Sequence, residues 1–344
     1  MYDKNPFTLT FGKQPNNFIS RYDDTTTVID TFCNSDLSQT YLIEGVRGSG
    51  KTVLMTAISN ELKEKPDWIA INLNPSLDLL EDMARRLHDS CKTIPNLLGK
   101  NINISFAGIG VGVGINETLQ DSISIIRNIL EPIKKKNKKV LITIDEVLNN
   151  KNMRTFASQF QIFVREDYPI YLIMTGLSEN INEIQNDPAL TFLLRSPKIF
   201  MGPLSSLQIT KKYSELLNID TEKAKELASV TQGYAFAYQA LGASYWEYKK
   251  NPDLQKIISK LDDMLDDYVY KKIWASLTDK EKEIVLSIDH PHTPTAEICQ
   301  KTGIKPTSFS QYKKRLTLKG VLSTENHGYN TLALPRFYEI VIMY

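Results

Sequence analysis

Short runs of apolar residues recur along the N-terminal part of the chain, and stretches in which apolar residues return with the helical period lie between them. A run that is apolar at successive positions indicates a strand buried on both faces, as in a parallel sheet. We expect five such strands, at 41–44, 68–71, 140–144, 169–176 and 199–201. We expect the intervening helices at 25–32, 53–58, 78–91, 119–130, 156–165 and 187–195. This alternation predicts an α/β fold with a five-stranded parallel sheet.

The pattern becomes entirely helical from 206 to about 270, which predicts a small helical domain, here called the lid. Thr221 is a suitable N-cap for a helix over 222–229. A second helix, over 231–248, is expected to bury Phe236, Leu241 and Trp246. We therefore place the domain that holds the sheet at 1–204 and the lid at 205–272.

The remaining residues, 273–344, predict a third domain built from three short helices and a hairpin. The first helix begins near Leu277, and the others are expected at 295–301 and 307–319. Segments 320–322 and 331–334 are expected to pair as a two-stranded wing. This order of elements predicts a winged helix-turn-helix.

Residues 102–115 alternate glycine with apolar residues over much of their length, which predicts a strand or a hairpin with a glycine face. The dinucleotide-binding fingerprint needs a third glycine, and this segment has Val113 or Ile115 at that place. We interpret the segment as a structural insertion. Contact with a partner or with nucleic acid is the alternative.

The segment after the first expected strand is rich in glycine and leads into a helix. Such a turn lets successive backbone N–H groups point at phosphate oxygens. Lys51 is expected to reach the β- and γ-phosphates of ATP, and Thr52 to offer its hydroxyl to Mg²⁺. The residues expected to hold the nucleotide are Gly45, Val46, Arg47, Gly48, Ser49, Gly50, Lys51, Thr52 and Val53. The alternative is a glycine-rich turn that merely precedes a lysine.

Two carboxylates, Asp145 and Glu146, follow the strand expected at 140–144. Because parallel strands present their carboxyl ends at one edge of a sheet, we expect this pair to face the same edge as the glycine-rich turn. Asp145 would hold Mg²⁺ through a coordinated water, and Glu146 would polarise the water that attacks the γ-phosphate. The pair predicts ATP hydrolysis, with an ordinary polar strand end as the alternative.

Three further positions are candidates for nucleotide contacts. Thr175 ends the strand at 169–176, where it would either sense the γ-phosphate or simply satisfy the strand end. Arg195 ends a short helix and is either an arginine finger for a neighbouring subunit's γ-phosphate or an ordinary surface arginine. The irregular N-terminal arm carries Phe7, Phe11 and Arg21, which would wrap the nucleotide's base; an arm packed on the core is the alternative.

The third helix of the C-terminal domain is expected to expose side chains that can contact phosphates or base edges in a major groove. These candidate DNA contacts are Ser310, Gln311, Lys313, Lys314 and Arg315. Many winged helices pack against proteins instead, and the acidic residues Glu297, Glu325 and Glu339 weaken the local positive field. DNA is therefore the predicted partner, and a protein partner is the alternative.

Composition adds limits to this picture. The 344 residues carry a formal net charge of +1, so any attraction to DNA must come from a local patch. The sequence has neither an apolar run of bilayer length nor a secretory signal pattern at its start. Cys33, Cys91 and Cys299 lack paired spacing, which is typical of reduced thiols. We therefore expect a cytoplasmic protein that makes no membrane contact.

Taken together, these motifs resemble those of AAA+ ATPases related to archaeal origin-recognition and helicase-loader proteins. They are still more similar to bacterial AAA family ATP-binding proteins close to the STAND signalling ATPases. The matching segments are 5–7 with 11–12, 45–52, 142–147, 186–195, 202–204 and 231–234. The resemblance implies a P-loop NTPase of the ASCE type with a helical lid and a C-terminal winged helix. One departure is that positions 232–247 contain no basic residue, so the sensor-2 arginine of many AAA+ lids has no counterpart.

The resemblance implies an ATPase that acts as a switch. Bound Mg-ATP would fix the angle between core and lid, and the winged helix would be presented to DNA or withdrawn from it. A weakly hydrolysing or non-hydrolysing STAND-like scaffold, which uses the winged helix for protein contacts, is the alternative. A helicase-loader-like role is a third hypothesis. ATP and ADP are the expected ligands, and an ATP-dependent homo-oligomer is a further expectation.

Overall fold

The computed structural model describes residues 4–10, 14–35, 37–95, 97, 115–323 and 328–344, with side chains omitted for 115–121. Contacts divide the chain into two compact units. The first unit comprises Met1–Ser20, Gly45–Val53 and Met201–Tyr344, and the second comprises Arg21–Glu44 and Leu54–Phe200. Phe11, Glu325 and positions 102–114 of the predicted glycine-alternating segment lie outside the described residues. The division into three domains stays a prediction.

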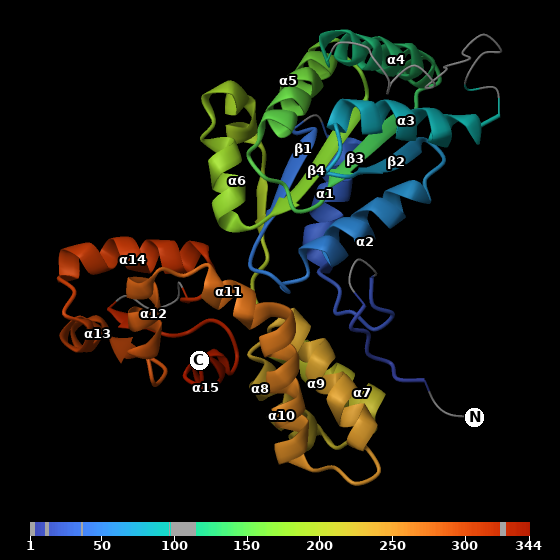
Figure 1. The fold of residues 1–344 in the computed structure, drawn as a ribbon. Coiled ribbons are helices and arrows are strands. Elements are labelled where there is room, and N and C mark those ends of the chain that lie inside the picture. The colour runs from blue at the N-terminus through green and yellow to red at the C-terminus, as the bar shows by residue number, and fades with distance from the viewer. Residues whose placement is uncertain (1–3, 11–13, 36, 96, 98–114, 324–327) are drawn as a thin grey trace. The chain divides into compact units, whose positions relative to one another are not determined.

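The second unit is built on a five-stranded sheet in the order β2-β3-β4-β1-β5 (Figure 1). Its strands are β1 (Thr40–Glu44), β2 (Trp68–Leu73), β3 (Lys139–Ile144), β4 (Ile170–Gly176) and β5 (Lys198–Phe200). All neighbouring strands are parallel. Each lies where an apolar run predicted it, so the predicted parallel α/β sheet is confirmed.

Both faces of the sheet are covered by helices. The helices of the second unit are α1 (Tyr22–Asn34), α3 (Leu79–Lys92), α4 (Ile115–Lys135), α5 (Lys151–Arg165), α6 (Ser178–Gln185) and the 3₁₀ helix η2 (Pro188–Arg195). On one face, alternate strand residues such as Ile142 and Leu172 share a core with α3, α4, α5 and α6. On the other face, Phe32 of α1 packs against Tyr41 and Tyr171. Helix α2 (Lys51–Lys63) begins in the glycine-rich turn and continues into this unit.

The segment between β4 and β5 differs from the prediction. The sequence predicted one helix at 187–195, whereas the structure has α6 and then the 3₁₀ helix η2. Helix α6 is short and mostly polar, and its apolar buried residues are Ile181 and Ile184, so its periodicity is weak. Asp187 lies before η2 and caps it, since its carboxylate accepts a hydrogen bond from the N–H of Ala189 at 2.9 Å.

The first unit is mostly helical outside its glycine-rich turn. Its elements are α7 (Ser206–Leu217), α8 (Thr221–Thr231), α9 (Ala235–Tyr248), α10 (Leu254–Leu265), the π-helix η3 (Asp266–Tyr270), α11 (Lys271–Ala275), α12 (Asp279–Leu286), β6 (Thr293–Pro294), α13 (Thr295–Thr302), α14 (Pro306–Leu318), β7 (Tyr329–Asn330) and α15 (Phe337–Val341). Within the described ranges, every helix of the chain is too short or too polar to serve as a membrane span.

Two details of the predicted lid were wrong. Asp220 caps α8 in place of Thr221, because its carboxylate accepts the N–H of Lys223 at 2.8 Å. The helix predicted over 231–248 starts only at Ala235, since Gln232 and Gly233 have left-handed backbones that end α8. Of its predicted core residues, Leu241 is buried, whereas Phe236 and Trp246 are half-buried.

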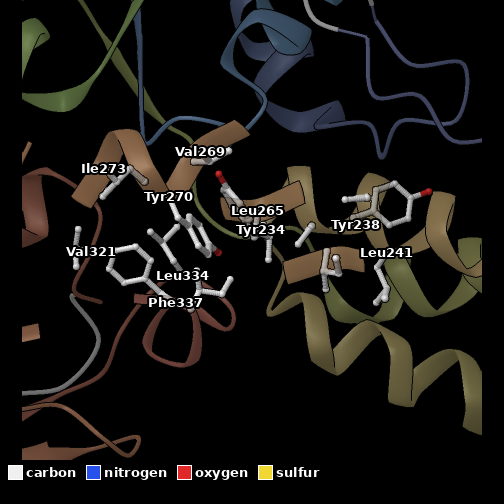
Figure 2. Close-up of a cluster of buried hydrophobic side chains, with 14 of the residues drawn as sticks. Tyr234, Tyr238, Leu241, Leu265, Val269, Tyr270, Ile273, Val321, Leu334 and Phe337 are labelled. Atoms are coloured by element: carbon white, nitrogen blue, oxygen red, sulfur yellow. The ribbon is translucent and has the colours of Figure 1, made fainter. Parts of the chain in front are cut away.

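One hydrophobic core joins the lid to the C-terminal helices within the first unit. Figure 2 shows Tyr270, Leu334 and Phe337 gathered in this cluster. The rings of Tyr270 and Phe337 meet edge to face with 4.9 Å between their centroids. The guanidinium of Arg336 forms a bidentate ion pair with the carboxylate of Asp262 on α10. Its Nε lies 2.5 Å from Oδ1 and its Nη2 lies 2.8 Å from Oδ2. The lid and the C-terminal helices therefore pack as one body.

The C-terminal helices follow the predicted order. Thr278 and Glu281 form a capping box at the start of α12, close to the predicted start of this helix. The predicted wing pairing is present as one antiparallel bridge between Leu322 and Leu332, flanked by a 2.9 Å hydrogen bond from Ala333 N–H to the carbonyl of Val321. An additional antiparallel pair, β6 with β7, was not predicted. The classification as a winged helix-turn-helix stays a prediction.

Candidate nucleotide site

The glycine-rich turn of residues 45–53, hereafter the P-loop, folds around its own lysine. Lys51 is buried, and its Nζ donates hydrogen bonds to the carbonyl oxygens of Gly45 at 3.0 Å and Val46 at 2.8 Å. The hydroxyl of Ser49 donates to the same Val46 oxygen at 2.9 Å. These bonds keep the predicted phosphate-binding ammonium group against the backbone of the loop.

The backbone of the P-loop has the conformation that a phosphate cradle needs. Gly48 and Gly50 have φ angles of 72° and 93°, in a region that residues with a Cβ rarely adopt. Turns of this kind make concave nests of N–H groups that bind anions. Helix α2 begins at Lys51, so its positive N-terminal end adds to the field, and Thr52 and Val53 lie in its first turn. The residues present therefore fit a phosphate group.

The lid donates two hydrogen bonds to backbone carbonyls of the P-loop, and sequence patterns did not predict them. The hydroxyl of Tyr234 donates to the carbonyl of Arg47 at 2.5 Å. The backbone N–H of Phe236 donates to the carbonyl of Gly48 at 3.1 Å. A Cβ added at Gly48 would lie 2.3 Å from the Tyr234 hydroxyl oxygen, so glycine is needed there for contact with the lid as well as for its φ angle.

The P-loop also contacts the C-terminal helices of its unit. Gly320, two residues after the end of α14, lies so close to Val46 that an added Cβ would be 1.5 Å from Val46 Cγ1. Val46 is half-buried and packs against the shared core of the unit. A P-loop side chain that the sequence analysis assigned to nucleotide binding thus has a packing role toward the C-terminal helices.

Two segments that carry the family resemblance meet beside these contacts. The N–H of Leu204 donates to the carbonyl of Gly233 at 2.8 Å. A Cβ added at Gly233 would be 2.7 Å from Pro203 Cβ, and its φ of 76° is left-handed. The two short motifs, 202–204 and 232–234, therefore pack against each other within the first unit.

The second unit holds the predicted carboxylates. Asp145 follows β3 and is half-buried, whereas the side chain of Glu146 is exposed. The buried hydroxyl of Thr175, in β4, donates a hydrogen bond to Asp145 Oδ1. The N–H of Glu146 donates to Asp145 Oδ1 at 3.1 Å and approaches Thr175 Oγ1 at 3.4 Å. Glu146 has a φ of 53°, an uncommon conformation for a residue with a side chain.

The order of strands gives these residues a common edge of the sheet. Strand β4 alone separates β1 from β3, and the last residue of β1, Glu44, is level with Gly176. Ile144, at the end of β3, is level with Met174. The P-loop starts immediately after β1, and Asp145 immediately after β3, so both segments leave the sheet from its carboxyl edge. Ligands of open α/β sheets bind outside this edge.

Glu44 is a further polar group at this edge, and the sequence analysis did not single it out. Burial raises the pKa of its carboxyl group, and the positive charge of Lys198, whose Nζ lies 3.9 Å away, opposes this rise. Its Oε2 is buried without a hydrogen-bond partner among the described residues. A single acidic residue after an apolar run carries no sequence signal that would distinguish this position.

The remaining predicted nucleotide contacts, Arg195, Arg21 and Phe7, belong to three different segments of the chain. Arg195 is exposed at the end of η2, and Arg21 precedes α1 in the same unit. Burial lowers the pKa of the Arg21 guanidinium, and Asp24 opposes this shift. The sequence predicts that Phe7 either wraps the nucleotide's base or packs with its arm on the core. Its ring is buried in the lid against Gly242 and the aromatic residues Tyr213 and Tyr238, as the alternative of a packed arm proposed.

The candidate DNA contacts all lie on α14, and they differ in exposure and in the partners of their side chains. Ser310, Gln311, Lys314 and Arg315 are exposed. Lys313 is half-buried, and its Nζ donates to the carbonyl of Tyr329 at 3.1 Å. Arg315 lies 3.3 Å from the buried carboxylate of Glu281 and stacks over the ring of Tyr312. Two of the predicted basic contacts are therefore engaged inside their own unit.

Comparison with known proteins supports the fold assignment. Residues 267–341 match the model of a domain of unknown function, DUF8462, which covers η3 to α15. A search of curated proteins finds no match. Among solved structures, the Walker-type ATPase PABY2304 of Pyrococcus abyssi is similar, with a TM-score of 0.71, 12% sequence identity, and coverage of 98% of this chain and 99% of that chain.

Two further solved structures are similar over the same length. The ORC2 protein of Aeropyrum pernix, solved as ADPNP-ADP complexes, has a TM-score of 0.63 and 13% identity, covering 97% of this chain and 96% of that one. Cdc6p from Pyrobaculum aerophilum has a TM-score of 0.51 and 15% identity, with the same coverage of each chain. At these identities the likeness concerns the fold, which is that of AAA+ P-loop ATPases. The predicted fold and resemblance are confirmed to that extent.

Proposed function

We propose that this chain, with its AAA+ P-loop fold, binds Mg-ATP and hydrolyses it as the control step of a DNA-binding switch. The observation that carries the proposal is the shared carboxyl edge of one parallel sheet. Strand β1 leads from it into the P-loop, and β3 leads from it into Asp145 and Glu146. This is the arrangement in which ATP-hydrolysing sheets place phosphate-binding and metal-binding groups.

Each side chain has a distinct task in this proposal. Lys51 leaves its backbone carbonyl partners and binds the β- and γ-phosphates. The N–H groups of 45–53 cradle the same phosphates. Glu146 orients the attacking water. Thr175 contacts the γ-phosphate and also holds Asp145 in position through its hydrogen bond. Arg21 lies toward the nucleotide, and Arg195 serves the site of a second copy in an ATP-dependent homo-oligomer.

A magnesium ion fits the oxygen donors that these residues supply. The hydroxyl of Thr52 and the carboxylate of Asp145 are ligands of the hard, oxygen type that Mg²⁺ prefers. When bound, the ion would neutralise charge on the β- and γ-phosphates. Asp145 is suited to this task because hydrogen bonds from Thr175 and from the N–H of Glu146, both to its Oδ1, fix the orientation of the carboxylate.

A phosphate-release assay tests the hydrolytic part of the proposal. Glu146→Gln should lower the rate about a hundredfold or more while ATP still binds, because the residue that orients the water is lost. Lys51→Ala should abolish nucleotide binding. Glu222→Gln, an exposed glutamate on α8, is the matched control and should leave the rate unchanged. Equal rates for wild type and Glu146→Gln would refute the hydrolytic role.

The second part of the proposal is that α14 presents Lys314, Gln311 and Ser310 to DNA, with Lys313 and Arg315 joining after release from their internal partners. Binding should weaken steeply with salt, since lysine and arginine contacts to phosphates release counterions. Lys314→Glu should lower the affinity and flatten the salt dependence, measured by fluorescence anisotropy with duplex DNA. Lys225→Glu, at an exposed position of α8, is the charge-matched control. A helicase-loader-like role would additionally require ATP to steepen this binding.

A specific contact favours the rival function of a nucleotide-binding scaffold that recruits a protein. Arg315 is held by Glu281, whose carboxylate is buried, so the predicted recognition helix has part of its positive charge neutralised. A scaffold of this kind would bind ADP or ATP without detectable turnover and would ignore duplex DNA at physiological salt. The two assays above distinguish it from the switch.

A further inference from the structure

Tyr234 occupies the junction between the lid and the P-loop. It lies between α8 and α9, and its side chain is 6% exposed. Burial raises the pKa of its hydroxyl further above neutral pH, where a tyrosine hydroxyl is protonated in any case and can act as a donor. Its acceptor is the carbonyl of Arg47, 2.5 Å away, inside the segment that binds phosphate under the proposed function.

The geometry of the peptide bond gives this contact a consequence. A peptide unit is planar, and its C=O and N–H point in opposite directions. Holding the Arg47 carbonyl therefore also fixes the direction of the Gly48 N–H. The N–H of Phe236, bonded to the Gly48 carbonyl at 3.1 Å, fixes the next peptide unit in the same way. Two successive peptides of the P-loop are thus oriented from the lid.

The P-loop is shaped to receive this contact. Gly48 combines a φ of 72° with the absence of a side chain, and a Cβ there would lie 2.3 Å from the Tyr234 hydroxyl oxygen and 2.9 Å from Tyr234 Cζ. The ring is further set by Phe236, whose centroid lies 6.5 Å away in an edge-to-face arrangement. Glycine at 48 and tyrosine at 234 therefore fit one another.

The composition of positions 232–247 of the lid indicates how this part of the lid reaches the P-loop. Positions 232–247 contain no lysine or arginine that could bind a γ-phosphate directly. The lid reaches the phosphate-binding segment through the backbone of that segment instead, at Arg47 and Gly48.

From these observations we infer that Tyr234 is a positioning residue of the phosphate site, which acts through the Arg47–Gly48 peptide to aim the Gly48 N–H at a diphosphate group. This inference rests on the proposed function, because it assumes that the P-loop binds a nucleoside di- or triphosphate. The recognised chemistry is the diphosphate itself, so adenine contacts play no part in it.

The chain supplies matched controls for a test. Tyr213 and Tyr270 are likewise buried tyrosines whose hydroxyls donate to backbone carbonyls, of Tyr238 at 2.7 Å and of Pro335 at 2.6 Å. Tyr→Phe at each of the three positions removes one comparable hydrogen bond and keeps the ring. All three variants should lose similar thermal stability, but only the acceptor of Tyr234 lies in the P-loop.

The experiment is isothermal titration of full-length wild type, Tyr234→Phe, Tyr213→Phe and Tyr270→Phe with ADP and with inorganic pyrophosphate, alongside thermal unfolding. Tyr234→Phe should bind both ligands about three- to tenfold more weakly, which corresponds to one net hydrogen bond. The other two variants should match wild type in affinity. Equal affinities for Tyr234→Phe and Tyr213→Phe would overturn the inference, whereas a wild type that binds neither ligand would refute the proposed function itself.

A second measurement keeps the inference testable if Tyr234→Phe fails to fold. Hydrogen exchange in wild-type protein should show the Phe236 amide protected as strongly as the amides in the body of α9, because it is bonded to Gly48. Addition of ADP should increase this protection. Exchange at the rate of an unstructured amide would show that the lid does not hold the P-loop, and it would overturn the inference.

Discussion

Thr175 and Asp145 are joined by a hydrogen bond from the threonine hydroxyl to the aspartate carboxylate, which links the end of β4 to the end of β3. Thr175→Val keeps the shape of the side chain but removes this donor. We expect it to lower the free energy of unfolding by about 1–2 kcal/mol in urea titrations. Thr175→Ser retains the hydroxyl and should lose less. Equal stability of the valine variant and wild type would contradict the importance of the bond.

Gly48 and Gly303 allow a steric effect to be separated from a backbone effect. Both have left-handed φ angles, but an added Cβ would meet Tyr234 at position 48 and nothing within 4 Å at position 303. Gly303→Ala should therefore cost about 1 kcal/mol from backbone strain alone. Gly48→Ala should cost more in thermal unfolding, by about a further 1–3 kcal/mol. A smaller loss at 48 than at 303 would mean that Tyr234 moves away freely.

Phe7 and Gly242 form a pair whose coupling a double-mutant cycle can measure. Alanine in the middle of a helix is normally favoured over glycine by about 1 kcal/mol. At Gly242 the added Cβ would lie 2.3 Å from the ring of Phe7, so Gly242→Ala should destabilise wild type. Phe7→Ala alone should cost about 3–5 kcal/mol. In that background Gly242→Ala should become neutral or stabilising, and additive losses would contradict the packing of the arm on the lid.

Glu281 predicts a dependence of stability on pH. Burial by itself would raise the pKa of this carboxyl group, but hydrogen bonds from the Thr278 N–H and from Lys319, each 2.9 Å long, outweigh it and lower the pKa. A carboxylate with a lowered pKa in the folded state stabilises fully above the pKa of the unfolded chain, and this contribution is lost as pH falls through the folded value.

Urea unfolding at pH 7 and pH 3 measures this contribution. At pH 7, Glu281→Gln should be less stable than wild type by about 1–3 kcal/mol, because it lacks the charge that Lys319 and Arg315 face. At pH 3 the difference should shrink. A difference that stays constant or grows at low pH would show that the carboxylate contributes nothing through its charge.

Local patterns were sufficient for the strands of the sheet and for the position of the glycine-rich turn at its edge. Apolar runs located all five strands, and the glycine spacing around Lys51 located the P-loop. Parallel strands have a fixed relation between their carboxyl ends, so the common edge of the P-loop and Asp145 also followed from the sequence.

Local sequence patterns do not predict contacts between segments that lie far apart in the chain. Nothing near Tyr234 in the sequence indicates that its hydroxyl bonds to Arg47, and nothing near Phe7 indicates Gly242 as its neighbour. The Gln232-Gly233-Tyr234 motif gave a signal, but only through resemblance. Helix α6 was missed because its two buried isoleucines span less than one turn, which is too short for a period to emerge.

Helices α10, η3 and α11 follow one another without a break from Leu254 to Ala275, so α10 of the lid is continuous with the start of the DUF8462 segment, which begins at 267 within the π-helical turn. At about 1.5 Å per residue this helical backbone has a path length of about 30 Å. Small rotations of a rigid arm produce displacements that grow with distance from the pivot. Since the lid and the C-terminal helices pack as one body, a rotation of a few degrees about the contact between Tyr234 and the P-loop would therefore move the outer C-terminal helices by a larger distance than the lid residues beside that contact.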